Sequence, residues 1–118
     1  MPEGVKLVAL VRADPNLTRE QFEQRWTQGH AELALRLPRL RGYRINVAIE
    51  EFQEIEGELP FQGTAEMWWD SLEDMRADFA TPEAEAAVAD ADEFTLERIH
   101  IITREHVLRD GPQGSSHQ

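Results

Sequence analysis

Residues 16–43 read NLTREQFEQRWTQGHAELALRLPRLRGY, and this stretch decides the fold. Thr18 followed three residues later by Gln21 matches a capping box, in which the two residues satisfy backbone N–H groups at the start of a helix. Pro38 ends the helix, because the residue before a proline is pushed out of the helical region. The stretch therefore predicts a helix over residues 18–37.

The apolar side chains of this helix recur at helical spacing, so they form one stripe facing a core: Phe22, Trp26, Leu33 and Leu37. His30 is the polar exception. At about 100° per residue it lies roughly 45° from the centre of the stripe, one turn beyond Trp26. The pattern therefore places an imidazole at the edge of a buried face, beside a large aromatic ring.

Alternating or continuous apolar residues predict four strands, over residues 5–12, 40–49, 61–69 and 94–107. A second helical region begins at Ser71, which can cap a helix, and restarts where Thr81 caps and Pro82 takes the first helical position. Residues 51–60 are acidic and end in Gly-Glu-Leu-Pro, so we expect an exposed loop there.

The order strand, helix, strand, strand, helix, strand predicts an α+β, ferredoxin-like fold: a four-stranded antiparallel sheet with both helices on one face. We assign residues 1–108 to this single domain and the polar residues 109–118 to a flexible tail. Both parities of the strands carry apolar residues, so a monomer would leave one sheet face in water. We therefore expect a symmetric homodimer that stacks sheet on sheet.

Composition narrows the classes of function. The 118 residues include no cysteine, which excludes disulfides and thiolate chemistry and is compatible with a reducing cytoplasm, where we place the protein. With 23 acidic and 12 basic side chains, the net charge of −11 argues against nucleic acid and anionic membranes as partners. The amino-terminal stretch predicts a first strand and not a signal peptide. No stretch approaches the length of a transmembrane span.

Four short motifs follow one another along residues 5–108: Trp26-x-x-x-His30-Ala31, the run from Leu37 through Tyr43 to Asn46, the run from Phe61 to Ser71, and Thr81-Pro82-Glu83 leading to Asp90 and Phe94. Their order and spacing resemble the EthD-like proteins of the dimeric α/β-barrel superfamily. The resemblance implies a homodimer, a small pocket between the sheet and helices of each subunit, and chemistry without metal or organic cofactor.

Members of that family include lactone isomerases, dehydratases or decarboxylases of polyketide pathways, and accessory proteins in the degradation of alkyl ethers. In the isomerases a histidine on the first helix takes part in catalysis, and the resemblance matches His30 to it. The cysteines found near such sites have no counterpart here.

His30 and Tyr43 are the candidate catalytic residues. An unperturbed histidine has a pKa near 6.5, so His30 can accept or donate a proton near neutrality. Tyr43 can donate a hydrogen bond to a developing oxyanion. Each has a structural alternative: a histidine hydrogen-bonded to a backbone carbonyl at the edge of the core, and a core tyrosine with a solvated hydroxyl.

The candidates for substrate binding are aromatic and polar residues near these two in the predicted fold: Phe22, Trp26, Leu33, Asn46, Glu66, Trp68 and Trp69. Only one of the two adjacent tryptophans can face the helices, because side chains alternate along a strand. His100 and His106 lie six residues apart on the last predicted strand, about 20 Å, so they cannot bind one metal ion.

We therefore expect a cofactor-independent enzyme that moves protons on a small hydrophobic cyclic or aromatic substrate, in an isomerase, dehydratase, decarboxylase or cyclase reaction. Two alternatives remain open from the sequence. One is a cofactor-free oxygenase. The other is a non-catalytic binding protein that assists a degradative oxygenase.

Overall fold

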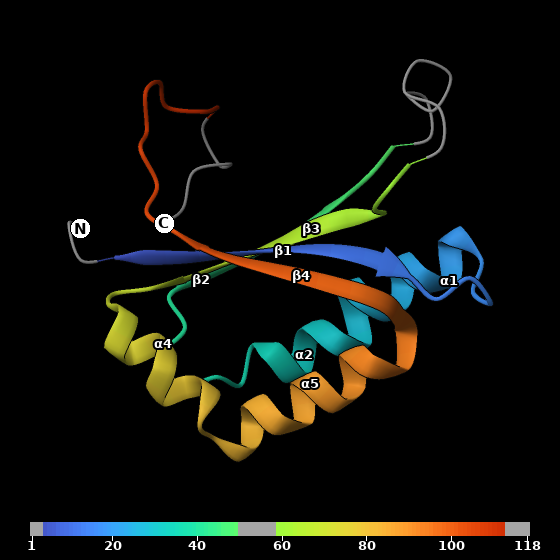
Figure 1. The fold of residues 1–118 in the computed structure, drawn as a ribbon, viewed down its shortest axis with the longest axis horizontal. Helices are drawn as coiled ribbons and strands as arrows, with labels where there is room; N and C mark the ends of the chain where they lie inside the picture. Colours follow the sequence, from blue (N-terminus) through green and yellow to red (C-terminus); the bar gives the residue numbers. More distant parts are fainter. Residues whose placement is uncertain (1–3, 50–58, 113–118) are drawn as a thin grey trace.

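In the part of the chain that the structure describes, an antiparallel sheet forms the upper layer, and the helices lie on one side of it (Figure 1). The computed structural model describes residues 4–49 and 59–112. Its strands are β1 (Val5–Ala13), β2 (Gly42–Val47), β3 (Gly63–Trp69) and β4 (Thr95–Thr103), in the sheet order β2-β3-β1-β4. This is the predicted ferredoxin-like α+β fold. Most of the predicted loop at 51–60 and the end of the predicted tail lie outside the described residues.

The first helical segment begins as predicted and changes its geometry halfway. Thr18 Oγ1 accepts a hydrogen bond from Gln21 N at 3.1 Å, and Gln21 Oε1 accepts one from Thr18 N at 2.9 Å, so the capping box is confirmed. The segment then runs through α1 (Arg19–Gln24), a π-helical turn η1 (Arg25–His30) and α2 (Ala31–Ala34).

The π-helical turn shifts the buried stripe by one position. Ala31 N donates to Trp26 O, an i to i−5 bond that inserts one extra residue into the turn. In consequence Ala34 is buried where continuous α-helical spacing predicts Leu33, which is only half-buried. The expectation that Leu33 belongs to the buried stripe is therefore wrong. Phe22, Trp26 and Leu37 are buried as predicted.

The second helical region consists of α4 (Leu72–Phe79) and α5 (Pro82–Phe94). Both predicted caps are confirmed: Ser71 Oγ accepts from Asp74 N at 3.0 Å, and Thr81 Oγ1 accepts from Ala84 N at 3.2 Å. Helix α5 then leads directly into β4, which is the edge strand beside β1. Among the described residues, no helix is long and apolar enough to cross a membrane.

Side-chain alternation divides the sheet into two faces. On β1 the residues Val5, Leu7, Ala9 and Val11 are buried and face the helices. The intervening side chains lie on the opposite face, which we call the open face; its apolar members include Val8, Leu10, Trp68, Ile99 and Ile101. Ile99 and Ile101 are 40% and 50% exposed. The expectation that both parities of the strands are apolar is therefore confirmed for the sheet.

Candidate functional site

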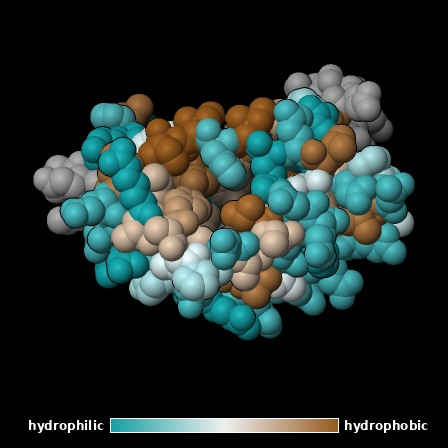
Figure 2. Space-filling view, turned by 60° about the horizontal axis from the view of Figure 1, so that its bottom comes forward, coloured by the Kyte–Doolittle hydropathy of each residue, from teal (hydrophilic) through white to brown (hydrophobic). Residues whose placement is uncertain are grey.

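A cavity of about 90 Å³ lies between the helix-facing side of the sheet and the helices η1, α2 and α5. Most of its lining is apolar, and Figure 2 shows hydrophobic side chains near the centre of the side that carries the helices, surrounded by hydrophilic ones. The lining residues are Leu7, Ala9, Val11, Trp26, His30, Ala34, Leu37, Tyr43, Ala65, Met67, Phe79, Ala84, Ala87, Val88, Ala91, Phe94, Thr95, Arg98 and His100.

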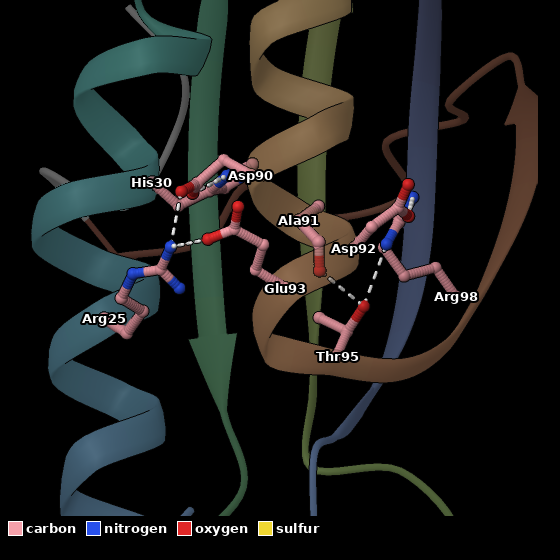
Figure 3. A network of polar contacts seen from close by, with 8 residues as sticks. All are labelled: Arg25, His30, Asp90, Ala91, Asp92, Glu93, Thr95 and Arg98. Carbon is pink, nitrogen blue, oxygen red and sulfur yellow. Dashed lines mark hydrogen bonds and ion pairs between the residues drawn. The ribbon is translucent and has the colours of Figure 1, made fainter.

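His30 stands at the wall of this cavity and is held by a carboxylate from another helix. Its Nδ1 lies 3.0 Å from Asp90 Oδ2 on α5, although the two residues are sixty positions apart in the sequence (Figure 3). The side chains of His30 and Asp90 are only 13% and 17% exposed. The ring also packs against Phe94 at 5.3 Å between centroids. Among the described residues, no hydrogen bond to His30 Nε2 is found.

Asp90 is itself fixed by a cation on the first helical segment. Arg25 Nη2 lies 2.5 Å from Asp90 Oδ1 and 3.3 Å from Glu93 Oε1. Figure 3 shows Arg25 and His30 side by side on one helix, both directed at acidic residues of α5. The two oxygens of Asp90 therefore serve different partners, Arg25 and His30.

Burial is the main influence on the protonation of His30. Desolvation lowers the pKa of His30 below its usual value, and the charges of Arg98 and Arg25 act in the same direction, while Asp90 opposes them. The neutral ring is therefore favoured at pH 7. With Nδ1 beside a carboxylate, its proton is assigned to Nδ1, and Nε2 is left as a basic nitrogen.

Tyr43 on β2 lines the same cavity as His30. Burial raises the pKa of Tyr43 to about 12, so its hydroxyl keeps its proton across the physiological range. A protonated phenol can donate a hydrogen bond to a substrate oxygen that gains negative charge. The structure therefore brings together the two residues that the sequence nominates for catalysis.

Three polar residues at the end of α5 and on β4 were not nominated from the sequence as site residues: Thr95, Arg98 and His100. Arg98 and His100 pair with Val11 and Ala9 of β1, so they share the helix-facing parity of the sheet. Alternation along β4 could have placed Arg98 and His100 on one face of the sheet. The sequence does not show which face meets the helices, because both faces of β1 carry apolar residues. Partial burial and the charge of Arg98 lower the pKa of His100.

Of the predicted substrate-binding residues, Trp26 lines the cavity and three others lie elsewhere among the helices and on their side of the sheet. Phe22 is buried behind Trp26, with ring centroids 5.2 Å apart. Trp69 is fully buried, and its Nε1 donates to Asp78 at 2.8 Å. Leu33 does not line the cavity, because of the π-helical turn described above.

Asn46, Glu66 and Trp68 lie on the open face, away from the cavity. Asn46 Nδ2 donates to Glu66 Oε2 at 3.2 Å, and Lys6 Nζ lies 3.1 Å from Glu66 Oε1 and 4.7 Å from the centroid of the Trp68 ring. The backbone register explains this position, since Glu66 and Trp68 pair with Val8 and Lys6, which point away from the helices. These residues therefore contribute no wall to the cavity.

A metal centre has no obvious place in the described part of the chain. Within residues 4–49 and 59–112, no group of three or more His, Asp or Glu side chains is arranged to hold a metal ion.

The fold and this cavity define a ferredoxin-like α+β protein with a largely apolar internal site that carries a carboxylate-bound histidine. The EthD domain family matches residues 14–97, and the chain belongs to this family. An ethyl tert-butyl ether d (EthD) family protein from Bacillus halodurans is similar to it, with 27% sequence identity, a TM-score of 0.74, and coverage of 87% of this chain and 99% of that chain. No curated protein matches the chain.

Two more distant structures share the fold. A dimeric ferredoxin-like protein of unknown function from Thermobifida fusca is 22% identical, with a TM-score of 0.63 and coverage of 85% of this chain and 89% of that chain. SnoaB, a cofactor-independent oxygenase from Streptomyces nogalater, is 12% identical, with a TM-score of 0.64 and coverage of 91% and 99%. The fold is therefore shared with one protein described as dimeric and with one described as an oxygenase.

Proposed function

We propose that this EthD-family chain is a cofactor-independent enzyme that moves protons on a small hydrophobic cyclic or aromatic molecule. The observation that carries the proposal is the 3.0 Å contact between His30 Nδ1 and Asp90 Oδ2, made by a histidine that lines an apolar cavity. A histidine oriented by a carboxylate is the usual arrangement for a general base.

Each residue has a distinct part in such a reaction. Neutral His30 removes a proton from the substrate through Nε2, and Asp90 stabilises the imidazolium that results. Tyr43 donates a hydrogen bond to the oxygen on which negative charge develops, as in an enolate or phenolate. The apolar lining excludes water, which strengthens these interactions. Return of the proton to another atom of the substrate would complete an isomerisation, dehydration or cyclisation.

The size of the cavity limits the substrate. Its volume of about 90 Å³ is smaller than the roughly 150 Å³ of an engineered apolar protein cavity that binds benzene. We therefore expect one small ring to fill the cavity, with its substituents extending toward the rim, unless side chains move.

The experiment incubates wild-type protein in D₂O with five- and six-membered lactones, phenols and small aromatic ketones, and follows conversion and C–H exchange by NMR. We expect His30→Gln to lower the rate by about 10²–10⁴-fold. His106→Gln removes an exposed histidine and is the matched control. A rate in His30→Gln equal to that of the control would end the proposal.

The same experiment separates the two alternatives. Conversion that consumes O₂ would favour a cofactor-free oxygenase, and binding without conversion or exchange would favour an accessory binding protein. We make neither the leading proposal, because the contact between His30 and Asp90 supports proton transfer most directly.

We also propose that the open face forms the interface of a homodimer. Support comes from its exposed isoleucines, Ile99 and Ile101, and from the apolar side chains of Val8 and Leu10 next to them. Light scattering after gel filtration should give a dimer for wild type and a monomer for Ile101→Lys. A monomeric wild type at micromolar concentration would contradict this proposal.

A further inference from the structure

The polar groups of the cavity include several hydrogen-bond donors and one permanent cation. Five lining residues carry polar side chains, namely His30, Tyr43, Thr95, Arg98 and His100, and none is a carboxylate. Thr95 Oγ1 already donates to Ala91 O at 2.8 Å, and His30 offers its acceptor Nε2, since its Nδ1 binds Asp90. Tyr43, Arg98 and His100 can each donate a hydrogen bond to a ligand, and Arg98 carries a permanent positive charge. This is notable in a chain with a net charge of −11. The lining therefore suits a ligand that supplies acceptors and negative charge.

Arg98 is placed to supply that charge. Its side chain is 19% exposed. Two hydrogen bonds orient the guanidinium: Nη1 donates to Thr95 Oγ1 at 2.8 Å, and Nη2 donates to Asp92 Oδ1 at 2.9 Å (Figure 3). Within the described chain, these two bonds occupy two of the five N–H groups of the guanidinium. Asp92 is 66% exposed, so water screens much of its pairing with Arg98.

The position of Arg98 relates it to both histidines of the cavity. Its charge contributes to the lowered pKa of His30 and of His100. A bound anion beside Arg98 would offset this effect. Arg98 and His100 are also two residues apart on the edge strand and on the same face of the sheet, so their side chains lie next to each other along the rim of the cavity.

We propose that the ligand of this cavity is a small carboxylic acid, with its carboxylate bound by Arg98 and His100 at the rim and its apolar ring placed beside Trp26 and His30. This inference rests on the proposed function and narrows its substrate class. Arginine suits the role because its planar fork of donors matches a carboxylate. The apolar walls then favour a ring over a second charged group.

The test compares matched pairs of probes that differ in charge but hardly in shape: benzoate with benzamide, and cyclopentanecarboxylate with cyclopentanecarboxamide. Affinities are measured by calorimetry or ligand-observed NMR on wild type, Arg98→Gln, Arg98→Lys and Arg76→Gln. Arg76 is exposed on α4 and does not line the cavity, so Arg76→Gln controls for the loss of one positive charge.

We expect wild type and Arg76→Gln to bind the carboxylates about tenfold or more tightly than the amides, since charge-assisted hydrogen bonds are roughly twice as strong as neutral ones. Arg98→Gln should remove this preference without changing the affinity for amides, and Arg98→Lys should restore part of it. If Arg98→Gln does not fold, as judged by circular dichroism, His100→Gln should show a smaller loss in the same direction.

Equal affinity for carboxylates and amides in wild type would overturn the inference, and so would an Arg98→Gln variant that folds and keeps the preference. Neither result would bear on the proposed function, which is tested separately by comparing turnover of neutral lactones and phenols in wild type and His30→Gln. Conversely, selective binding of carboxylates without any turnover dependent on His30 would support the binding site and contradict the proposed function.

Discussion

Gly63 at the start of β3 is the position where a single methyl group should do most damage to the wall of the cavity. A Cβ at this residue would lie 2.2 Å from Asn46 O and 2.8 Å from the nearest atom of the Trp26 ring. The carbonyl belongs to a neighbouring strand and has little freedom to move. Overpacking of a core costs about 1–3 kcal/mol, and we expect Gly63→Ala to fall in the upper half of that range.

Gly29 provides the matched control for this prediction. A Cβ at Gly29, in the π-helical turn, meets no atom within 4 Å. The same substitution there should stabilise the protein by about 0.5–1 kcal/mol, because alanine loses less backbone entropy than glycine in a helix.

Urea unfolding followed by circular dichroism measures both variants. For a slope of about 1.5 kcal/mol per M, Gly63→Ala should lower the midpoint by about 1–2 M, and Gly29→Ala should raise it slightly. The close approach of Trp26 to β3 would be refuted if Gly63→Ala changed the free energy of unfolding by less than about 0.5 kcal/mol.

Three further predictions concern the buried polar groups. Asp78→Ala should destabilise the protein by about 2–5 kcal/mol in urea unfolding, because Trp69 Nε1 and the backbone N–H of Arg39 would lose the carboxylate that accepts their hydrogen bonds; a loss below 1 kcal/mol would contradict this. The pKa of His30 is lowered on folding, so the unfolded chain binds more protons as the pH falls below about 6.5. Its contribution to stability is therefore present above that pH and lost below it, which urea midpoints from pH 8 to 5 will measure. A weaker trend in His30→Gln is the expected result, because the lowered pKa of His100 acts in the same direction, and an unaltered trend would assign it to other groups. Asp90→Asn should lower the pKa of His30 further, since Asp90 is the group that raises it, and an unchanged or higher value in an NMR titration would show that the two side chains are not in contact.

Much of the fold is predictable because its signals are local. The capping residues Thr18, Ser71 and Thr81 each lie within three residues of the groups that they bind, and all three were recognised. The order of elements then limits the topology to few arrangements. The ferredoxin-like fold follows from these signals.

The π-helical turn was not predictable in the same way. Its position depends on how the segment packs, and no residue type between Arg25 and His30 predicts an i to i−5 hydrogen bond. One extra residue in the turn replaced Leu33 by Ala34 in the buried stripe. The same shift moves His30 closer to the centre of the buried face than uniform α-helical spacing indicates.

Only part of the cavity lining could be nominated from the sequence, for a physical reason. His30, Tyr43 and Trp26 could be nominated from their own types and spacing. The face of each strand that meets the helices could not be predicted, because apolar residues occupy both parities of β1. For this reason the sequence nominates Trp68 for a cavity that it does not line. The contact between His30 and Asp90 joins two helices, so it is fixed only by tertiary packing.

We propose that Asp90 holds neutral His30 with its proton on Nδ1 and its basic Nε2 toward the cavity. Long-range ¹⁵N–¹H NMR of the imidazole rings, recorded through a pH titration on wild type and Asp90→Asn, tests this most directly. We expect the Nδ1–H tautomer for His30, a pKa below 6.5, and a change of tautomer population in Asp90→Asn. A His30 ring that carries its proton on Nε2 at pH 7, or that is unaffected by Asp90→Asn, would contradict it.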